Sequence, residues 1–147
     1  MIAQDLQKMI GEAMKARDEV RLSTLRLLSS AFNYERIEKQ HELSEEEELV
    51  VIRKEAKKRK DAIETYKKLN AKNPNAKLRQ EREEKELKIL QEFLPAEPTE
   101  EDIKKVVNEV VTDGMQIGQA IGLVKSKLPN SDGAIVANLV RQKLTND

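Results

Sequence analysis

The sequence predicts an all-α protein, and three observations support that fold class. Apolar residues recur at helical spacing through most of the 147 residues, and no stretch forms a convincing β-strand. Charged residues make up 37% of the chain and aromatic residues only 3%, which suits long amphipathic helices that each need one apolar stripe to pack. Two segments, Ser44–Glu47 and Thr99–Asp102, have the polar pattern that opens a helix. A large spherical core is therefore not expected.

Two helices are expected in the first 40 residues. The apolar stripe of the first is Ile2, Leu6, Met9 and Ala13. The second is expected to run from near Asp18 to about Lys39. Its apolar residues cover about half of the helix circumference, which predicts contacts on two sides. They are Val20, Leu25, Leu27, Leu28, Ala31, Phe32 and Tyr34. The four aromatic side chains of the protein are expected to fill the core.

The third and fourth helices are predicted to form a long antiparallel hairpin. Ser44–Glu47 is a capping box, because the serine hydroxyl accepts from the third helical N–H while the Glu47 carboxylate reaches back to the cap N–H. The helix that follows is expected to end near Asn70, and Asn73-Pro74-Asn75 marks the turn. The fourth helix is expected to end at Leu94.

The early part of the fourth helix is entirely polar. Arg79–Glu86 contains no apolar residue, so this stretch is expected to project into water. The pairs Glu81–Lys85 and Glu84–Lys88 have the favoured orientation for ion pairs on one helix, each worth about 0.3–0.5 kcal/mol.

Pro95-Ala96-Glu97-Pro98 is the predicted domain boundary, because two prolines in so short a segment end one helix and stiffen the chain that follows. The sequence thus divides into an N-terminal helical unit over residues 1–94, a proline-containing linker over 95–98 and a three-helix C-terminal domain over 99–147.

The C-terminal domain begins with a second capping box and an apolar stripe. Gly114 is the expected C-terminal cap of this first helix. Two further helices are expected over about 116–128 and 132–144, and Gly118 and Gly122 are expected to let another backbone approach closely. The stripe is Ile103, Val106, Val107, Val110 and Val111.

The composition excludes several classes of chemistry. The absence of Cys removes disulfides, cysteine–zinc sites and thiol nucleophiles, and His41, the one histidine, cannot alone build a His-rich metal site. No glycine-rich phosphate loop or activated nucleophile is found, so we predict no catalytic residue, no metal and no cofactor. The 27 basic and 27 acidic residues give zero net charge. A nucleic-acid partner would therefore be met by a local patch.

The sequence also indicates a compartment. Its apolar runs are far shorter than the roughly 20 residues of a membrane span. The N-terminal residues lack the basic segment and apolar stretch of a secretory signal. With the absence of Cys, these features predict a cytoplasmic protein without a membrane partner.

The clearest charged feature lies in the third helix. Basic residues gather on the half opposite its apolar stripe, along about 20 Å, and this row would suit a phosphate backbone. The alternative is a solvated face whose charges are balanced by the acidic fourth helix. The basic residues are Arg53, Lys54, Lys57, Lys58, Lys60, Lys67 and Lys68.

Arg59 has a different position, in the middle of the apolar arc of the third helix. Glu55 lies one turn earlier, in the favourable order, which predicts a partly buried structural ion pair. A weaker basic set lies near the ends of the last two helices, and solvated surface is again its alternative. This set is Lys125, Lys127, Arg141 and Lys143.

Five stretches together carry a family resemblance. They are Arg21–Leu28, Arg53–Asp61, Glu86–Pro95, Ile117–Gly122 and Asp132-Gly133. In this order they resemble the YqeY-like proteins of the GatB/YqeY family, which are related to the tail domain of GatB, a component of the tRNA-dependent Asp/Glu amidotransferase. The similarity runs through nearly the whole chain, and the Leu-Pro ending of the fourth helix is its most specific piece.

The resemblance implies an all-α fold whose small C-terminal domain is of the amidotransferase-tail kind. Because that tail contacts tRNA, the resemblance implies tRNA, an aminoacyl-tRNA or an amidotransferase assembly as the partner. Our leading hypothesis is a non-catalytic accessory protein that binds such a partner. Two alternatives stay open. One is a helical protein-docking module without RNA, and the other is carbon–nitrogen ligase activity with glutamine as amido donor, which the kinship suggests. The sequence makes no prediction of the oligomeric state.

Overall fold

The computed structural model describes residues 1–69 and 72–146, and in these residues it contains seven α-helices and no β-strand. The all-α prediction is therefore confirmed. Within the same ranges, no helix combines the length and the apolar character needed to cross a membrane. The helices are α1 (Ile2–Lys15), α2 (Glu19–Lys39), α3 (Glu45–Leu69), α4 (Pro74–Gln91), α5 (Glu100–Val110), α6 (Ile117–Lys127) and α7 (Gly133–Asn146).

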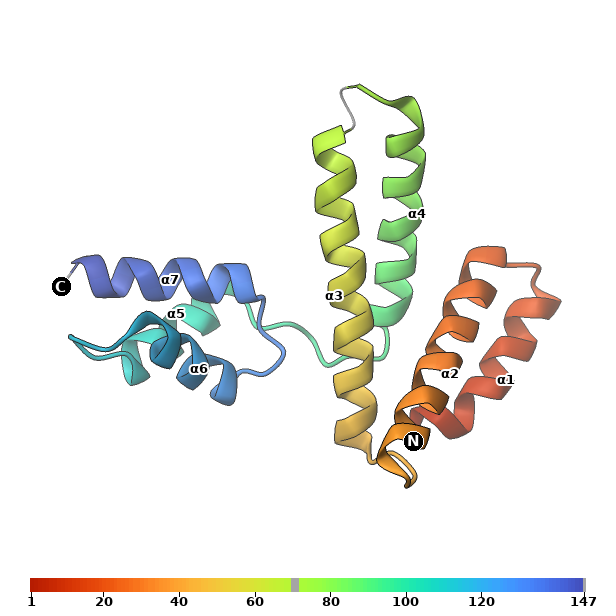
Figure 1. Ribbon diagram of the computed structural model, residues 1–147, viewed down its shortest axis with the longest axis horizontal. Helices are drawn as coiled ribbons and strands as arrows, with labels where there is room; N and C mark the ends of the chain where they lie inside the picture. The colour runs from red at the N-terminus through yellow and green to blue at the C-terminus, as the bar shows by residue number, and fades with distance from the viewer. Residues whose placement is uncertain (70–71, 147) are drawn as a thin grey trace. The chain divides into compact units, whose positions relative to one another are not determined.

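The chain forms two compact units, Met1–Leu94 and Pro95–Asp147, and each has a hydrophobic core of its own. In the first unit α2 lies between α1 and the pair α3–α4 (Figure 1). Helices α3 and α4 run side by side in opposite directions, so they form a hairpin. The buried residues of this core are Leu6, Ala13, Leu25, Leu28, Phe32, Leu43, Val51, Ile52 and Leu90.

The starts of α2 and α3 follow from local sequence. The Asp18 side chain accepts a hydrogen bond from the Arg21 N–H at 3.1 Å and so caps α2. At α3 the Glu47 N–H donates to Ser44 Oγ at 3.2 Å, and the Ser44 N–H donates to Glu47 Oε2 at 2.9 Å. The predicted capping box is confirmed. The hydrogen bond from the Ser44 backbone lowers the pKa of the Glu47 carboxyl, since it stabilises the charged form.

A buried carboxylate from α3 caps α1. Glu48 is fully buried and accepts hydrogen bonds from the N–H of Ile2 at 3.3 Å and of Ala3 at 2.6 Å. Met1 at the N-cap position supplies no side-chain acceptor, so the first two N–H groups of α1 depend on Glu48. The negative charge also lies at the positive end of the α1 dipole. This contact joins two helices that are more than 40 residues apart in the sequence.

The prediction that all four aromatic side chains fill the core is wrong for Tyr34. Phe32 is buried and Tyr66 and Phe93 are half-buried, but Tyr34 is exposed. Leu27 is also exposed. The wide apolar arc of α2 therefore reaches beyond the surface that α1, α3 and α4 cover.

Three expectations about α4 are also wrong. Pro74 is the first residue of the helix rather than part of the turn, with the Asn73 side chain as its N-cap, and the helix ends at Gln91. The polar stretch Arg79–Glu86 does not simply project into water, because Glu86 is buried. The ion pairs expected within the helix at Glu81–Lys85 and Glu84–Lys88 do not form among the described residues. The end of α3 expected near Asn70 lies outside the described residues.

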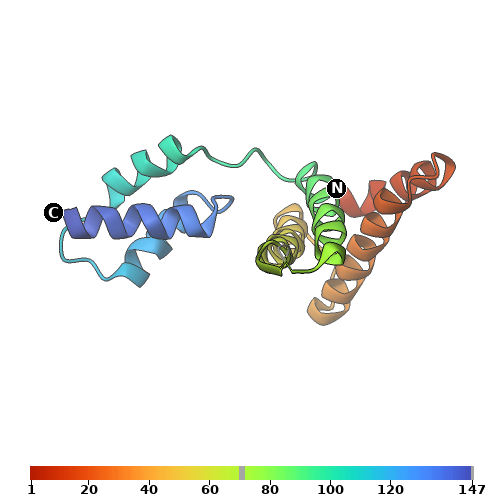
Figure 2. The same cartoon turned by 90° about the horizontal axis from the view of Figure 1, so that it is seen from above.

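In the second unit α7 packs against both α5 and α6 (Figure 2). The Asp102 N–H donates to Thr99 Oγ1 and the Thr99 N–H donates to Asp102 Oδ2, both at 3.1 Å, so the second capping box is confirmed. The buried residues of this core are Ile103, Val107, Val111, Ala120, Val124, Val136, Leu139 and Val140.

The glycine expectations in this unit are wrong. The C-cap of α5 is Val111, and Gly114 lies three residues later in the turn, where its φ of +81° suits a residue without Cβ. A Cβ built on Gly118 or on Gly122 has no neighbour within 4 Å. Among the residues that the structure describes, no other backbone comes within 4 Å of such a Cβ.

Glu48→Ala is expected to destabilise the first unit by about 2–4 kcal/mol, because two N–H groups lose their acceptor and a cavity replaces the side chain. Glu48→Gln keeps one acceptor oxygen in nearly the same shape and is expected to cost about 1–2 kcal/mol. Urea unfolding followed by circular dichroism measures both. An Ala variant as stable as the parent protein would show that α1 does not depend on this cap.

Candidate nucleic-acid interface

The outer face of α3 carries exposed lysines. Ile52, Ala56 and Ile63 are buried on the inner side of the helix, so residues half a turn away point to water. Lys54, Lys57 and Lys68 belong to this outward side and are exposed. None of these three has an ion pair or side-chain hydrogen bond with another described residue. We call them the free lysines.

Two other predicted cations are exposed but paired on their own helix. Lys58 Nζ lies 3.0 Å from Glu55 Oε1, and Lys67 Nζ lies 3.7 Å from Glu64 Oε1. Both lysine side chains are more than half exposed, so these contacts are weak and readily exchanged for another anion.

Arg53 and Lys60 lie on the flank of α3 and are half-buried. The Arg53 Nε is buried and has no hydrogen-bond partner among the described residues. The structure therefore places the seven predicted cations of α3 in three settings, and the free lysines are the set that is exposed without a partner among the described residues.

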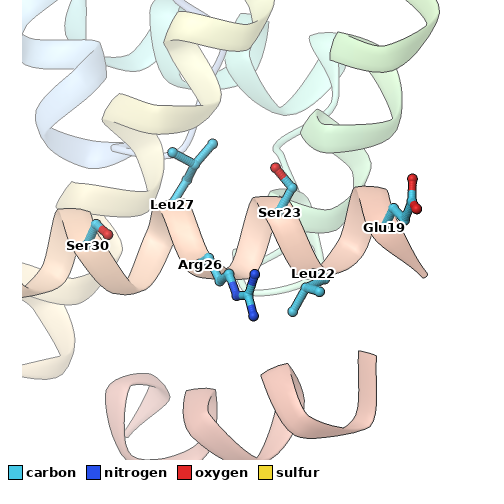
Figure 3. Close-up of a pocket in the computed structure, with 6 residues that line it drawn as sticks. All are labelled: Glu19, Leu22, Ser23, Arg26, Leu27 and Ser30. Atoms are coloured by element: carbon cyan, nitrogen blue, oxygen red, sulfur yellow. The ribbon is translucent and has the colours of Figure 1, made fainter. Parts of the chain in front are cut away.

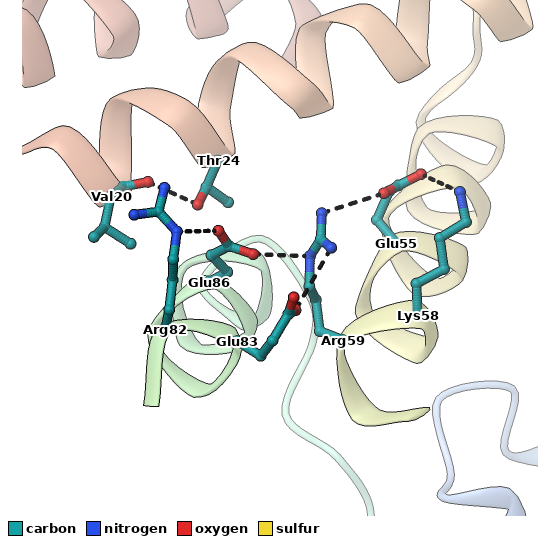
Figure 4. Close-up of polar contacts among 8 residues, drawn as sticks. All are labelled: Val20, Thr24, Glu55, Lys58, Arg59, Arg82, Glu83 and Glu86. Atoms are coloured by element: carbon teal, nitrogen blue, oxygen red, sulfur yellow. Dashed lines mark hydrogen bonds and ion pairs between the residues drawn. The ribbon is translucent and has the colours of Figure 1, made fainter. Parts of the chain in front are cut away.

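Arg59 lies on the inner side of α3 and joins it to α4 (Figure 4). Its Nε is 3.2 Å from Glu86 Oε2, and its Nη1 is 3.5 Å from Glu83 Oε2. The contact with Glu55 Oε2, predicted as an ion pair, is longer at 3.9 Å. Arg82 reaches Glu86 Oε1 from the other side, with Nε at 3.2 Å. We call these five residues the Arg59 cluster.

The Arg59 cluster affects the titration of Glu83. Burial raises the pKa of the Glu83 carboxyl, and the neighbouring Arg59 charge only partly offsets that effect. The Glu83 Oε2 atom is buried and has no aligned hydrogen-bond donor among the described residues. The ionised form of Glu83 is therefore less well stabilised than in water.

Sequence reasoning missed Glu83 and Glu86. The sequence did contain a signal for them. Arg79–Glu86 has no apolar residue, so where it packs against Arg59 in the hairpin it can contribute only polar or charged side chains. Turning acidic side chains inward leaves the hairpin surface basic. Between residues 53 and 88 there are fourteen Lys and Arg but only seven Asp and Glu, and three of these acids surround Arg59.

The weaker basic set does not form one patch. Lys125 is half-buried, and its Nζ donates to the Ser131 carbonyl at 2.5 Å, which ties the end of α6 to the following turn. Lys127 follows in the same last turn and is exposed. Exposed Arg141 and half-buried Lys143 lie near the end of α7. Because a short turn joins α6 to α7 and the two helices pack antiparallel (Figure 1), the two pairs lie at opposite ends of these helices.

His41 lies in the loop before α3 and is exposed, as expected for a surface residue. Its Nδ1 is 2.7 Å from the Glu42 carbonyl oxygen and its Nε2 is 3.6 Å from Glu47 Oε1. Among the described residues, no group of three or more acidic, His or Cys side chains is arranged to hold a metal ion.

Comparison with known proteins defines the class of the chain. A family model described as Yqey-like protein matches residues 3–144. The chain therefore belongs to the YqeY-like family, as the resemblance predicted. No curated protein gives a significant match.

Arg59→Met is expected to destabilise the first unit by about 3 kcal/mol, because Glu83 and Glu86 lose their main cationic partner while remaining largely buried. Lys58→Met is the matched control, since it removes an exposed ion pair from the same helix and is expected to cost less than about 1 kcal/mol. Urea unfolding measures both losses. Equal losses in the two variants would contradict a structural role for the Arg59 cluster.

Glu83→Gln is expected to change the pH dependence of stability. Because the folded-state pKa of Glu83 is raised, its protonated form favours folding, and this contribution is lost as pH rises from the usual carboxyl range through the raised value. The variant should therefore gain stability relative to the parent protein between about pH 4 and pH 7. Urea unfolding of both proteins across that range tests the sign, and a difference that is independent of pH would refute it.

Proposed function

We propose that this protein is a non-catalytic accessory protein that binds tRNA, or a complex of tRNA with an enzyme, through the outer face of α3. The observation that carries the proposal is the set of three free lysines, Lys54, Lys57 and Lys68. They are exposed, have no acidic partner among the described residues and lie in a segment with twice as many basic as acidic residues. The proposal assigns no reaction to the chain itself.

The spacing of the free lysines suits a nucleic-acid backbone. Lys54 and Lys68 are fourteen positions apart on the helix, which is about 21 Å at 1.5 Å per residue. Lysine side chains are flexible point charges that suit phosphate oxygens. No aromatic residue lies between them on the outward side, so charge and shape rather than base stacking would drive the interaction.

One further observation supports tRNA among polyanions. Membership in the YqeY-like family brings the kinship with the amidotransferase tail, a tRNA-contacting element. The other candidate cations would then add secondary contacts. Lys58 and Lys67 would exchange a weak partner on their own helix for a phosphate, while Lys127 and Arg141 are exposed on the second unit.

The combined variant Lys54→Ala, Lys57→Ala and Lys68→Ala is expected to weaken binding to total tRNA and to reduce the steepness of its salt dependence. If each lysine contacts one phosphate, the log–log slope should fall in magnitude by about 2–3. Fluorescence anisotropy with labelled tRNA, measured across salt concentrations, gives both quantities.

The matched control is Lys8→Ala, Lys15→Ala and Lys105→Ala, which removes the same charge from exposed lysines outside the hairpin. It should leave the affinity and slope nearly unchanged. An equal loss of affinity in both variants would show that binding depends on net charge and not on the position of the free lysines. Failure of the parent protein to bind tRNA at low salt would remove the proposal altogether.

A further inference from the structure

One face of α2 is apolar but points away from the core of its own unit. Leu27, Tyr34 and Ile37 are 48%, 68% and 70% exposed, whereas Leu28 and Phe32 of the same helix are buried. Large apolar side chains that are exposed in a row indicate a contact surface.

This face, which is exposed at Leu27, Tyr34 and Ile37 and half-buried at Val20 and Ser23, has the period of a helix-pairing seam. Residues 20, 27 and 34 recur every seven positions, and residues 23, 30 and 37 do so three positions later. This alternation of three and four residues is the spacing that brings two helices together along a stripe. We call the six residues the α2 seam. They are Val20, Ser23, Leu27, Ser30, Tyr34 and Ile37.

A hollow of about 320 Å³ opens along the N-terminal half of the α2 seam (Figure 3). Its lining residues fall into two overlapping sets spaced i, i+3, i+4 and i+7. Four residues with this spacing form the hole that receives a side chain from a facing helix. The lining residues are Glu19, Leu22, Ser23, Arg26, Leu27 and Ser30.

We propose that the α2 seam pairs with the α2 seam of a second copy of this chain, in antiparallel orientation. In the register that uses all six positions, Leu27 faces Ser30 of the other copy, Tyr34 faces Ser23, and Val20 faces Ile37. Leu27 and Tyr34 then each meet a serine, and the Tyr34 ring of the second copy enters the hollow over Ser23. A parallel pair would instead set serine on serine and Tyr34 on Tyr34, which leaves gaps and clashes.

The charges beside the α2 seam fit the same partner. Arg17 precedes α2 and Glu38 lies in its last turn, and both are exposed without an ion pair to another described residue. Antiparallel pairing brings Arg17 of one copy beside Glu38 of the other, twice by symmetry. A parallel pair would bring like charges to the same end. The seam is therefore self-complementary in both size and charge.

Sedimentation equilibrium of the full chain tests the proposal. Protein concentrations from about 1 μM to about 1 mM cover the dissociation constants of weak and moderately stable dimers. The average mass is expected to rise from 16.8 kDa towards twice that value. Tyr34→Glu should raise the dimer dissociation constant about tenfold or more, because it places a charge in the hollow. Circular dichroism should show unchanged helix content, since Tyr34 is exposed.

Leu78→Glu is the control, because it changes an apolar side chain on α4 that is exposed to a similar degree but lies outside the seam. It should leave the association unchanged. A parent protein that stays at 16.8 kDa over the whole range, or association that Tyr34→Glu does not weaken, would overturn the proposal. If the face binds a partner of another kind instead, the parent protein is expected to stay at 16.8 kDa over the whole range.

Cysteine cross-linking tests whether the two α2 helices are antiparallel. Because the chain has no cysteine of its own, every disulfide comes from the introduced residues. In the antiparallel register the two Val20 positions lie about 26 Å apart along the axis, as do the two Ile37 positions, which is far beyond disulfide reach. Val20→Cys and Ile37→Cys proteins should therefore not cross-link alone but should form a mixed disulfide when combined. Cross-linking of either variant alone, or none in the mixture, would overturn the antiparallel pairing.

Discussion

The hairpin of the first unit depends on the guanidinium of Arg59, which faces carboxylates from its own helix and from α4. Without a cation at this position, Glu83 and Glu86 would be buried without their main partner, a cost of several kcal/mol. The same arrangement draws acidic side chains away from the outer surface. The free lysines on the far side of α3 therefore have no acidic partner among the described residues, and the Arg59 cluster contributes to the excess of basic side chains on the hairpin surface.

The apolar arc of α2 is wider than the interface inside its own unit needs. One part of the arc packs between α1 and the hairpin, where Leu25, Leu28 and Phe32 are buried. The other part remains uncovered within the unit. Since the free lysines lie on α3, pairing through α2 would not compete with RNA for the same side chains. A dimer would carry two basic faces, and two linked weak sites bind a long polyanion more tightly than one.

Local sequence signals predicted the helices well because they act over only a few residues. Both capping boxes were predicted and are confirmed, since a polar side chain satisfies N–H groups three residues away in almost any context. Predictions that required knowledge of a neighbour were less successful. Gly118 and Gly122 have the spacing of a close contact, but no other backbone in the described part of the chain approaches them. Tyr34 has the position of a core residue but is exposed.

The sequence by itself determined the all-α class, most helix starts, the absence of thiol chemistry and the row of cations on α3, because composition and helical period act locally. Only the tertiary structure decided which charges are available. It turned Glu83 and Glu86 towards Arg59, placed Glu48 at the start of α1 and tied Lys125 to a backbone carbonyl. The reason is that burial and pairing depend on residues distant in the chain, and helical spacing specifies the face of a side chain but not what lies opposite it.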